Sequence, residues 1–480
     1  MKRVANNLSE QNNTTPSGDS LYAKRIPIYP RSVKGKFRTF KSSVLALAFL
    51  VFYLLPWVPW DRGPGLPGQA VVFDLTAKTF YIFSLPVDIQ NIFWLAGVLA
   101  IFAFSLFFVT AVLGRVFCGY FCFQTLWTDA FIMIESVIQG NRNARKRLHE
   151  GPWTGEKFSK IGLTWLVWLI FAAWTGFTFT SYWMPAPELI KVVFIGKAPF
   201  AAYGTIAFIT AATFIMAGFS REQVCTYMCP YARFQGVMFD KDTLVVTYDE
   251  ARGERTKGRA KPTKALRDRD TRIEEGYGDC IDCDLCVQVC PAGIDIRDGI
   301  NYRCITCGLC IDACHNMMTS LKYPTGLIRY ASENSLEGKK TNYFTPRNIG
   351  YGIVIIIVAA ILAWSVSHRD VAHYIVESTR KPPTLLSDGR LQNTYELKFN
   401  NLTLESQKIH VAVEDPGYEL AMRFNDIILK PGERVALNAA VRKDKGVAFI
   451  PKVTFDITVS DPETGDVIDK QKMKAIFLER

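Results

Sequence analysis

Eight cysteines form two runs with the same internal spacing in the second half of the chain. The first run extends from Cys280 to Cys290 with the spacing C-x2-C-x2-C-x3-C and is followed by Pro291, and the second extends from Cys304 to Cys314. In bacterial ferredoxins, each such run supplies three thiolates to one [4Fe-4S] cluster and its fourth thiolate to the other cluster. We therefore predict two clusters, one held by Cys280, Cys283, Cys286 and Cys314, and the other by Cys304, Cys307, Cys310 and Cys290.

Zinc knuckles and disulfides also gather cysteines closely in sequence, but both fit these two runs less well. Zinc sites usually place two C-x2-C pairs farther apart, and disulfides are unstable in a reducing cytoplasm. The second run departs from the usual ferredoxin form because Cys314 is followed by His315 instead of proline. The potentials of both clusters stay open, since hydrogen bonds and solvent exposure tune them.

The other four cysteines form two C-x3-C motifs, Cys118-Gly-Tyr-Phe-Cys122 and Cys225-Thr-Tyr-Met-Cys229. If each motif is helical, its two sulfurs lie one turn apart on the same face. Soft thiolates favour Cu(I), and Met228 could add a thioether. We expect these cysteines to form a catalytic, copper-binding or redox-thiol site, while an additional iron-sulfur site and simple packing remain alternatives.

Long apolar segments must position these cysteines in or beside a membrane. Five segments are long enough to span a bilayer, which takes about 20 helical residues: 43–60, 91–114, 161–183, 200–219 and 348–367. A further apolar segment, 121–138, contains Asp129 and Glu135, and ionisable residues are costly in a membrane. We predict that this segment is interfacial or re-entrant and is not a sixth span.

Basic residues predict the orientation of the chain. They are concentrated before the first span and at 142–147, and positively charged loops stay in the cytoplasm. The net charge of +11 is thus explained by topology, and we do not expect nucleic-acid binding. No secretory signal peptide is visible, because the first 42 residues are polar. We predict a multi-pass protein of the bacterial cytoplasmic membrane, whose two ends lie on opposite sides.

The composition changes along the chain predict a multi-domain membrane protein. The α-helical transmembrane bundle is followed by a polar, cysteine-rich insertion and, after the last span, by short alternating runs such as 453–459 that indicate a β-sandwich. The expected parts are a cytoplasmic N-terminal segment (1–42), a four-span domain (43–239), a cytoplasmic ferredoxin-like domain (240–347), a fifth transmembrane helix (348–367) and a periplasmic domain (368–480).

Taken together, the two C-x3-C motifs and the double ferredoxin run resemble the CcoG/FixG family of cytochrome c oxidase accessory proteins, over nearly the whole chain. The resemblance implies an immunoglobulin-like C-terminal domain and a role in assembling a cbb-type heme-copper oxidase, with reduction of Cu(II) to Cu(I) for insertion. The implied partners are copper ions, oxidase subunits or their assembly factors, and an unidentified electron donor. Whether the protein forms a homodimer is open.

The leading hypothesis is therefore a membrane-bound iron-sulfur oxidoreductase that acts as a cupric reductase, with Cys118, Cys122, Cys225 and Cys229 at the copper site. Two alternatives from other classes remain. One is a quinol-linked electron-transfer subunit, which needs a quinone pocket that no sequence signature reveals. The other is a non-catalytic assembly scaffold that docks oxidase subunits through its β-sandwich.

Overall fold

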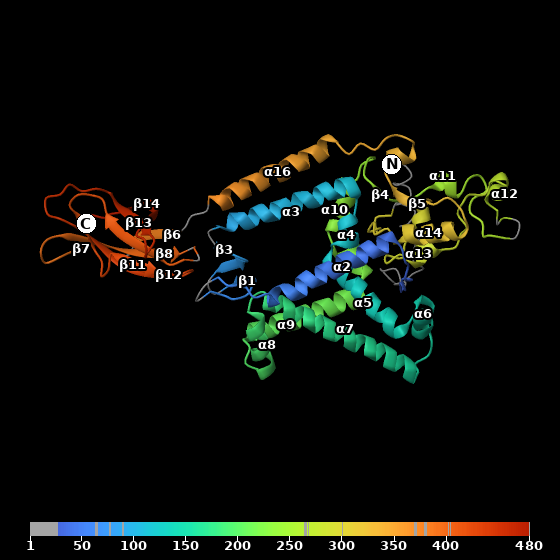
Figure 1. The fold of residues 1–480 in the computed structure, drawn as a ribbon, viewed down its shortest axis with the longest axis horizontal. Coiled ribbons are helices and arrows are strands. Elements are labelled where there is room, and N and C mark those ends of the chain that lie inside the picture. Colours follow the sequence, from blue (N-terminus) through green and yellow to red (C-terminus); the bar gives the residue numbers. More distant parts are fainter. Residues whose placement is uncertain are drawn as a thin grey trace, which may run out of the picture. The chain divides into compact units, whose positions relative to one another are not determined.

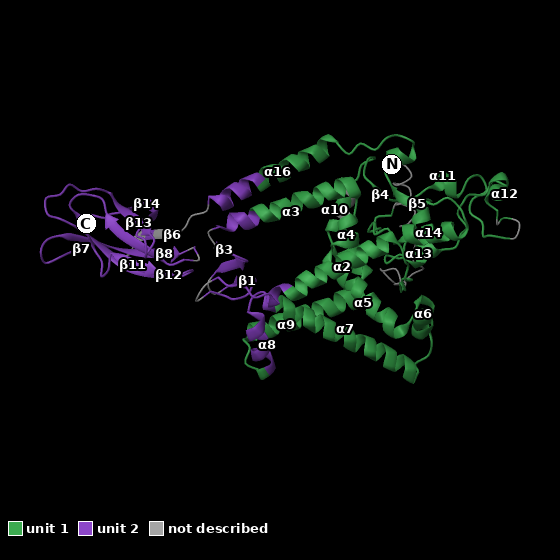
Figure 2. Cartoon of the chain, in the orientation of Figure 1, with its two compact units in different colours: residues 1–54, 97–180, 195–359 green, residues 55–96, 181–194, 360–480 purple. Residues whose placement is uncertain are grey.

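The computed structural model describes residues 27–62, 66–75, 78–88, 91–263, 266, 268–299, 301–368, 372–378, 382–401, 403 and 405–479. Most of the predicted N-terminal segment, 1–42, lies outside the described residues. The chain divides into two compact units (Figure 2). The first comprises residues 1–54, 97–180 and 195–359, and the second comprises 55–96, 181–194 and 360–480.

Five long apolar helices match the five predicted spans (Figure 1). They are α2 (Lys36–Leu54, extended by the 3-10 turn η1, Leu55–Trp57), α3 (Ile92–Leu113), α7 (Gly155–Ser181), α9 (Phe200–Thr213, continued by the π-helical η3, Phe214–Ser220) and α16 (Pro346–Ser367). Each has the length and composition needed to cross a bilayer. The prediction of a helical membrane region is confirmed.

A sixth segment, Val116–Gln139, also has the length and composition of a span, whereas the sequence favoured only five. It consists of α4 (Val116–Tyr120) and α5 (Phe123–Gln139), which are separated by a break at Cys122. The acidic residues within it are buried and paired with basic side chains, which lowers the cost that argued against a span.

Both ends of this sixth segment lie beside the cysteine-rich region. At its start, α4 packs against the backbone of Ile305. At its end, the segment is followed by α6 (Arg142–Glu150), in which the Arg145 side chain donates a hydrogen bond to the Pro30 carbonyl oxygen. The next residue, Arg31, donates its backbone amide to the Gln288 carbonyl oxygen at 2.7 Å, between the third and fourth cysteines of the first run. That the segment is interfacial or re-entrant stays a prediction.

The cysteine-rich region contains little regular structure. Strand β4 (Val245–Tyr248) pairs antiparallel with β5 (Ile328–Ala331), so that this pair brackets both cysteine runs. The other elements of the region are short: α10 (Tyr231–Met238), α11 (Glu250–Gly253), α12 (Arg269–Glu274), α13 (Leu285–Gln288), η5 (Ile296–Asp298), α14 (Leu309–Ser320) and α15 (Glu333–Leu336).

The second unit contains a small meander, a short helix and the C-terminal domain. The meander is formed by β1 (Val71–Asp74), β2 (Thr79–Ile82) and β3 (Leu85–Asp88), and α8 (Ala186–Ile195) follows α7. The C-terminal strands are β6 (Ala372–Ser378), β7 (Thr384–Leu385), β8 (Leu391–Asn401), β9 (Gln407–Val413), β10 (Tyr418–Ala421), β11 (Asp426–Leu429), β12 (Arg434–Lys443), β13 (Lys452–Ser460) and β14 (Val467–Ile476).

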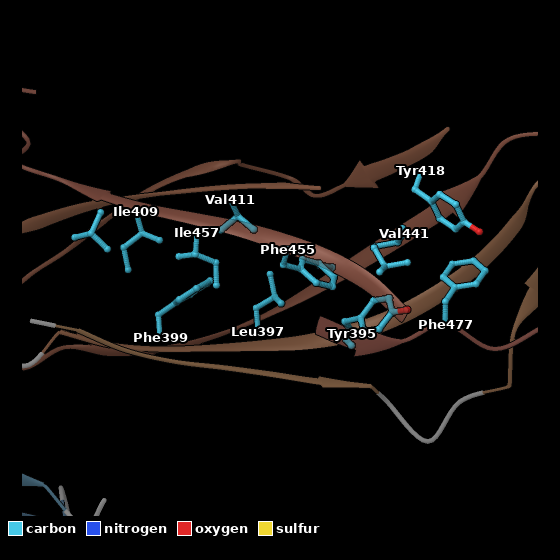
Figure 3. Close-up of a cluster of buried hydrophobic side chains, with 14 of the residues drawn as sticks. Tyr395, Leu397, Phe399, Ile409, Val411, Tyr418, Val441, Phe455, Ile457 and Phe477 are labelled. Atoms are coloured by element: carbon cyan, nitrogen blue, oxygen red, sulfur yellow. The ribbon is translucent and has the colours of Figure 1, made fainter. Parts of the chain in front are cut away.

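The C-terminal strands form two antiparallel sheets, as the alternating sequence predicted. One has the order β10-β12-β8-β6, with β7 added to β8, and the other has the order β11-β9-β13-β14. Alternate residues of each central strand are buried, and Leu397 and Phe399 of β8 lie close to Ile457 of β13 in a shared apolar core (Figure 3). Packing of two such apolar faces is what holds a β-sandwich together.

Candidate functional site

The first cysteine run lines a cavity of about 360 Å³. Its wall contains the four predicted ligands of one cluster, Cys280, Cys283, Cys286 and Cys314, together with apolar side chains of β4, β5 and α14. The structure thus brings the distant Cys314 to the first run, as the ferredoxin pattern requires.

A second cavity, of about 370 Å³, lies next to the first. Its wall contains the other four predicted ligands, Cys290, Cys304, Cys307 and Cys310. Cys286 also contributes to this wall, so the two cavities adjoin at that residue.

Left-handed backbone at matching positions bends each run around its cavity. Asp282 and Asp284 in the first run, and Thr306 and Gly308 in the second, have φ values between 48° and 71°. Aspartate and glycine accept this conformation more readily than most residues. The helices that carry the third cysteine of each run, α13 and α14, begin directly after these turns.

An arginine that the sequence analysis missed holds the first loop in place. Arg297 forms ion pairs with Asp282 and Asp284 at 2.7 Å each, and with Asp295 at 2.5 Å. Its side chain is only 7% exposed, and it lines the first cavity. Asp282 and Asp284 lie within the first cysteine run, but the spacing does not show that Arg297 joins them to Asp295 outside it.

The donor set and the walls suit iron-sulfur clusters. Each cavity offers four thiols in an apolar enclosure, and a cubic cluster binds one thiolate at each iron. Burial raises the pKa of Cys290 to about 11 and that of Cys304 to about 12, so iron must displace their protons. Among the described residues, no three histidine, cysteine or acidic side chains form a site for a single metal ion. The individual ligand assignments stay predictions.

The first C-x3-C motif packs directly on the second cysteine run. A Cβ atom on Gly119 would lie 2.6 Å from the Ile305 carbonyl oxygen and 3.1 Å from the Cys307 Cα atom, so only glycine permits this approach. Tyr120 donates a hydrogen bond from its hydroxyl to the Cys307 carbonyl oxygen at 2.8 Å. Cys118 is buried in the same apolar cluster as Cys307.

The four cysteines of the two C-x3-C motifs form one group around Cys225. Burial raises the pKa of the Cys225 thiol to about 12, and the neighbouring thiols of Cys122, Cys118 and Cys229 raise it further, whereas the Arg115 guanidinium opposes the shift. Such electrostatic coupling requires that these groups lie close to one another. The two motifs therefore lie near each other, although no three of these thiols form a site for a single metal ion in this structure.

The local geometry of these motifs differs from the regular helix that the spacing suggested. Cys122 has an extended backbone at the start of α5, and Cys225 lies in the π-helical segment η4 (Val224–Met228) with Cys229 at its end. The expectation that the paired sulfurs lie one α-helical turn apart is therefore wrong. π-helical segments are rare in proteins overall, but those that occur are often found at functional sites. The π-helical backbone at Cys225 therefore favours a functional role for this motif. Met228, the suggested thioether, is 61% exposed.

Polar contacts connect this thiol group to the cysteine-rich region. The Gln235 Oε1 atom accepts hydrogen bonds from Arg115 Nε at 2.7 Å and from Cys118 Sγ at 3.4 Å. Arg115 also donates to the Tyr302 carbonyl oxygen, two residues before Cys304. One arginine thus joins the thiol group to the loop that precedes the second cavity.

The two carboxylates of α5 are paired with basic side chains. Asp129 accepts a hydrogen bond from Arg38 at 2.9 Å and lies 3.5 Å from Lys41. Glu135 pairs with Arg221 at 2.7 Å and lies 3.7 Å from Arg145. These ion pairs offset the cost of burying charge. Because both basic partners of Glu135 stabilise its charge, a structural role explains why it is buried.

Comparisons with known proteins agree with these cavities. Residues 220–333 match the model of the 4Fe-4S dicluster domain, and the matched range includes the second C-x3-C motif. Residues 362–477 match the model of the IG-like fold at the C-terminal of FixG. The two cysteine runs are thus those of a two-cluster iron-sulfur domain, and the C-terminal sandwich is immunoglobulin-like.

Relatives resemble most of the chain. Protein RdxA of Cereibacter sphaeroides is 40% identical over 406 residues, which cover 82% of this chain and 84% of RdxA. Nitrogen fixation protein FixG of Rhizobium meliloti is 38% identical over 427 residues, which cover 82% and 80%. The crystal structure of a FixG-related protein from Vibrio parahaemolyticus is 22% identical over 22% of this chain and 97% of that one, with a TM-score of 0.19.

Proposed function

Since this chain belongs to the FixG family, we propose that it is a membrane-bound cupric reductase, which reduces Cu(II) to Cu(I) for the maturation of a cbb-type cytochrome c oxidase. The chain is a multi-pass iron-sulfur protein of the electron-transfer type. The proposal adds copper as the substrate and a cbb-type oxidase as the partner.

The observation that carries the proposal is the contact between the thiol group and the second cysteine run. Gly119 lies against the backbone of Cys307, and Cys118 shares an apolar cluster with it. When bound, [4Fe-4S] clusters supply one-electron transfer. Direct packing supports a short route for electrons between a predicted cluster ligand and the thiols.

In the proposed reaction, the side chains of Cys118, Cys122, Cys225 and Cys229 bind the copper ion, because soft thiolates favour Cu(I) over Cu(II). Each Cu(II) takes one electron. If the thiols themselves supplied the electrons, two thiolates would form a disulfide for every two Cu(II) reduced, and turnover would stop. An electron supply from the iron-sulfur domain leaves the thiolates intact.

The proposed location is the bacterial cytoplasmic membrane, with the N-terminus and the iron-sulfur domain in the cytoplasm. The basic helix α6 supports this, because cytoplasmic loops are enriched in lysine and arginine. The C-terminal sandwich would then lie in the periplasm and serve as a docking module for oxidase subunits or their assembly factors. Homodimerisation remains a prediction without a structural test.

The test is anaerobic mixing of dithionite-reduced, purified protein with Cu(II), with Cu(I) measured by a chromogenic chelator. A variant in which Cys118, Cys122, Cys225 and Cys229 are replaced by serine is compared at equal iron content. We expect rapid Cu(I) formation by the unaltered protein without disulfide formation, and its loss in the variant. Equal rates in both proteins would give these cysteines a structural role and favour the quinol-linked electron-transfer subunit.

A further inference from the structure

A third, larger cavity lies between the membrane helices and the iron-sulfur domain, within the first unit. It has an empty volume of about 650 Å³ and is lined by α5, by the segment 221–226 and by the loops 291–292 and 302–305. The cysteine motifs did not predict it, because its wall is assembled from several separate parts of the chain, among them also Lys41, Arg115 and Ala232.

Two polar atoms at this cavity lack a partner. Asp129 Oδ2 and Arg303 Nε are buried and make no hydrogen bond to any residue that the structure describes. The Asp129 side chain is only 9% exposed, and its other oxygen, Oδ1, receives the contacts from Arg38 and Lys41. A buried carboxylate oxygen without a donor is costly unless a ligand or water supplies one.

The remainder of the wall suits an uncharged ligand with an apolar body. Ile132, Ala232 and Ile305 supply apolar surface, and apolar walls with a few polar groups are typical of sites for small molecules. Of the cationic residues in the wall, Lys41 and Arg221 face the carboxylates Asp129 and Glu135, whereas Arg115 and Arg303 donate to uncharged oxygen atoms. The wall therefore offers both acidic and basic groups, which suits a ligand with a hydrogen-bond donor at one end and an acceptor at the other.

The position of the cavity connects both redox parts of the molecule. Cys225 of the thiol group lies in its wall. Pro291 and Arg303, also in the wall, are the sequence neighbours of Cys290 and Cys304, two predicted ligands in the second cavity. A ligand here would contact residues that adjoin both sites, so a redox-active ligand could exchange electrons with either of them.

We propose that this cavity binds a lipid-soluble quinol and that the quinol is the electron donor; the inference rests on the proposed function, for which it names the donor class. A quinol has an apolar ring with two hydroxyl groups. One hydroxyl donates a hydrogen bond to Asp129 Oδ2, and the oxygen at the other end of the ring accepts from Arg303 Nε.

The reaction balances with the two clusters of the domain. Oxidation of one quinol to the quinone breaks two O–H bonds and releases two electrons and two protons. The two electrons match two one-electron clusters. Asp129 accepts one proton, and Glu222 in the same wall accepts the other before both are released to water.

The test uses the purified full-length protein in detergent with decylubiquinone and decylubiquinol as probes. Binding of decylubiquinone is measured by calorimetry, and anaerobic bleaching of the iron-sulfur absorbance after addition of decylubiquinol is followed in a stopped-flow instrument. The variants are Asp129→Asn, which keeps the shape of the side chain, and Ala232→Leu, which fills the cavity. Asp466→Asn, at an exposed position in the C-terminal domain, is the matched control.

We expect saturable binding to the unaltered protein and to the Asp466→Asn control. We expect binding about tenfold weaker in Ala232→Leu, and quinol-driven bleaching about tenfold slower in Asp129→Asn, as loss of a hydrogen bond to a charged group implies. Iron content confirms that each variant is folded. Absence of saturable binding, or binding and bleaching unchanged in both variants, would overturn the proposal.

The two proposals fail differently in these experiments. If dithionite-reduced protein reduces Cu(II) but decylubiquinol neither binds nor bleaches the clusters, the quinol site is wrong and the cupric reductase stands. If decylubiquinol binds and bleaches the clusters but Cu(II) is not reduced with either donor, the quinol site stands and the copper proposal is wrong.

Discussion

The C-terminal sandwich and the cysteine-rich region differ in which side chains form their buried cores. In the sandwich, two sheets bury apolar side chains such as Phe399 and Phe455, and the backbone is paired along nearly every strand. Among the residues of the cysteine-rich region that the structure describes, only β4 and β5 form a sheet, and two strands alone are marginally stable in water. The buried positions there are occupied in part by the cysteines themselves.

This difference indicates where the stability of each region originates. Cys280 and Cys286 are less than 10% exposed, line the cavities and belong to an apolar cluster with Val246 and Leu327, so predicted cluster ligands make up part of this core. Iron and sulfide would fill these cavities and cross-link α13, α14 and the intervening loops. We infer that the sandwich is stabilised by its amino acids alone, and that the cysteine-rich region depends on its metal.

Removal of iron should have the largest effect and should separate the two regions. After anaerobic extraction of iron with a chelator, we expect trypsin to cleave rapidly within the cysteine-rich region, because metal binding is coupled to its folding. Cleavage within 382–479 should be unchanged. Mass spectrometry of the fragments over time measures both rates, and continued protection of the cysteine-rich region would contradict the inference.

Truncation of a core side chain of the sandwich should destabilise the sandwich and leave the cysteine-rich region unchanged. Phe455 is fully buried and packs edge-on against Tyr395 at 5.2 Å, so Phe455→Ala should destabilise the sandwich by about 3–5 kcal/mol. Its control, Phe424→Ala, removes a side chain that is 64% exposed and should change stability by less than about 0.5 kcal/mol. Pulse proteolysis in urea measures the sandwich, and loss of iron in Phe455→Ala would show that the regions are coupled.

A smaller effect is expected where the cysteine-rich region supports a membrane helix. The Asp312 carboxylate accepts hydrogen bonds from the backbone amides of Phe37 at 3.3 Å and Arg38 at 2.8 Å, in the first turn of α2. These amides have no partner within the helix. Asp312→Ala should therefore destabilise this turn by about 1 kcal/mol.

Hydrogen exchange at the Phe37 and Arg38 amides measures this loss, and faster exchange confined to that turn is the expected result. Asp268→Ala is the control, because Asp268 also accepts hydrogen bonds from the first-turn amides of a helix, in this case its own helix α12. Equal exchange at Phe37 and Arg38 in Asp312→Ala and in the unaltered protein would show that this carboxylate does not stabilise the helix.

The sequence was most informative where the pattern is local. The spacing of the cysteine runs predicted which four thiols meet in each cavity, although Cys314 and Cys280 are distant in sequence. Alternation along 453–459 predicted a strand with one buried face, as β13 has. Both inferences need only the geometry of a few consecutive residues, together with the known ferredoxin pattern.

The features that sequence reasoning missed depend on contacts between distant segments. Arg297 pairs with carboxylates from two loops, and the cavity proposed to bind quinol is lined by several distant parts of the chain. The number of apolar helices was underestimated because the acidic residues of α5 are neutralised by partners from other segments, among them Arg38 and Arg221. No local pattern contains that information.

The contact of Gly119 with the second cysteine run allows the most direct test of the account. In Gly119→Ala, the added methyl group would meet the Ile305 carbonyl oxygen and separate α4 from Cys307, while all twelve cysteines remain. The control is Gly162→Ala, at a helical glycine where the methyl group would meet no atom within 4 Å.

Both variants are matched for iron content, reduced with dithionite and mixed anaerobically with Cu(II) in a stopped-flow instrument, and the return of the iron-sulfur absorbance is followed. The account predicts that Gly119→Ala reoxidises at least about tenfold more slowly than Gly162→Ala and the unaltered protein, because rearrangement of this contact lengthens the route to the thiols. Equal rates in all three proteins would contradict the proposal that electrons reach the copper site through this contact.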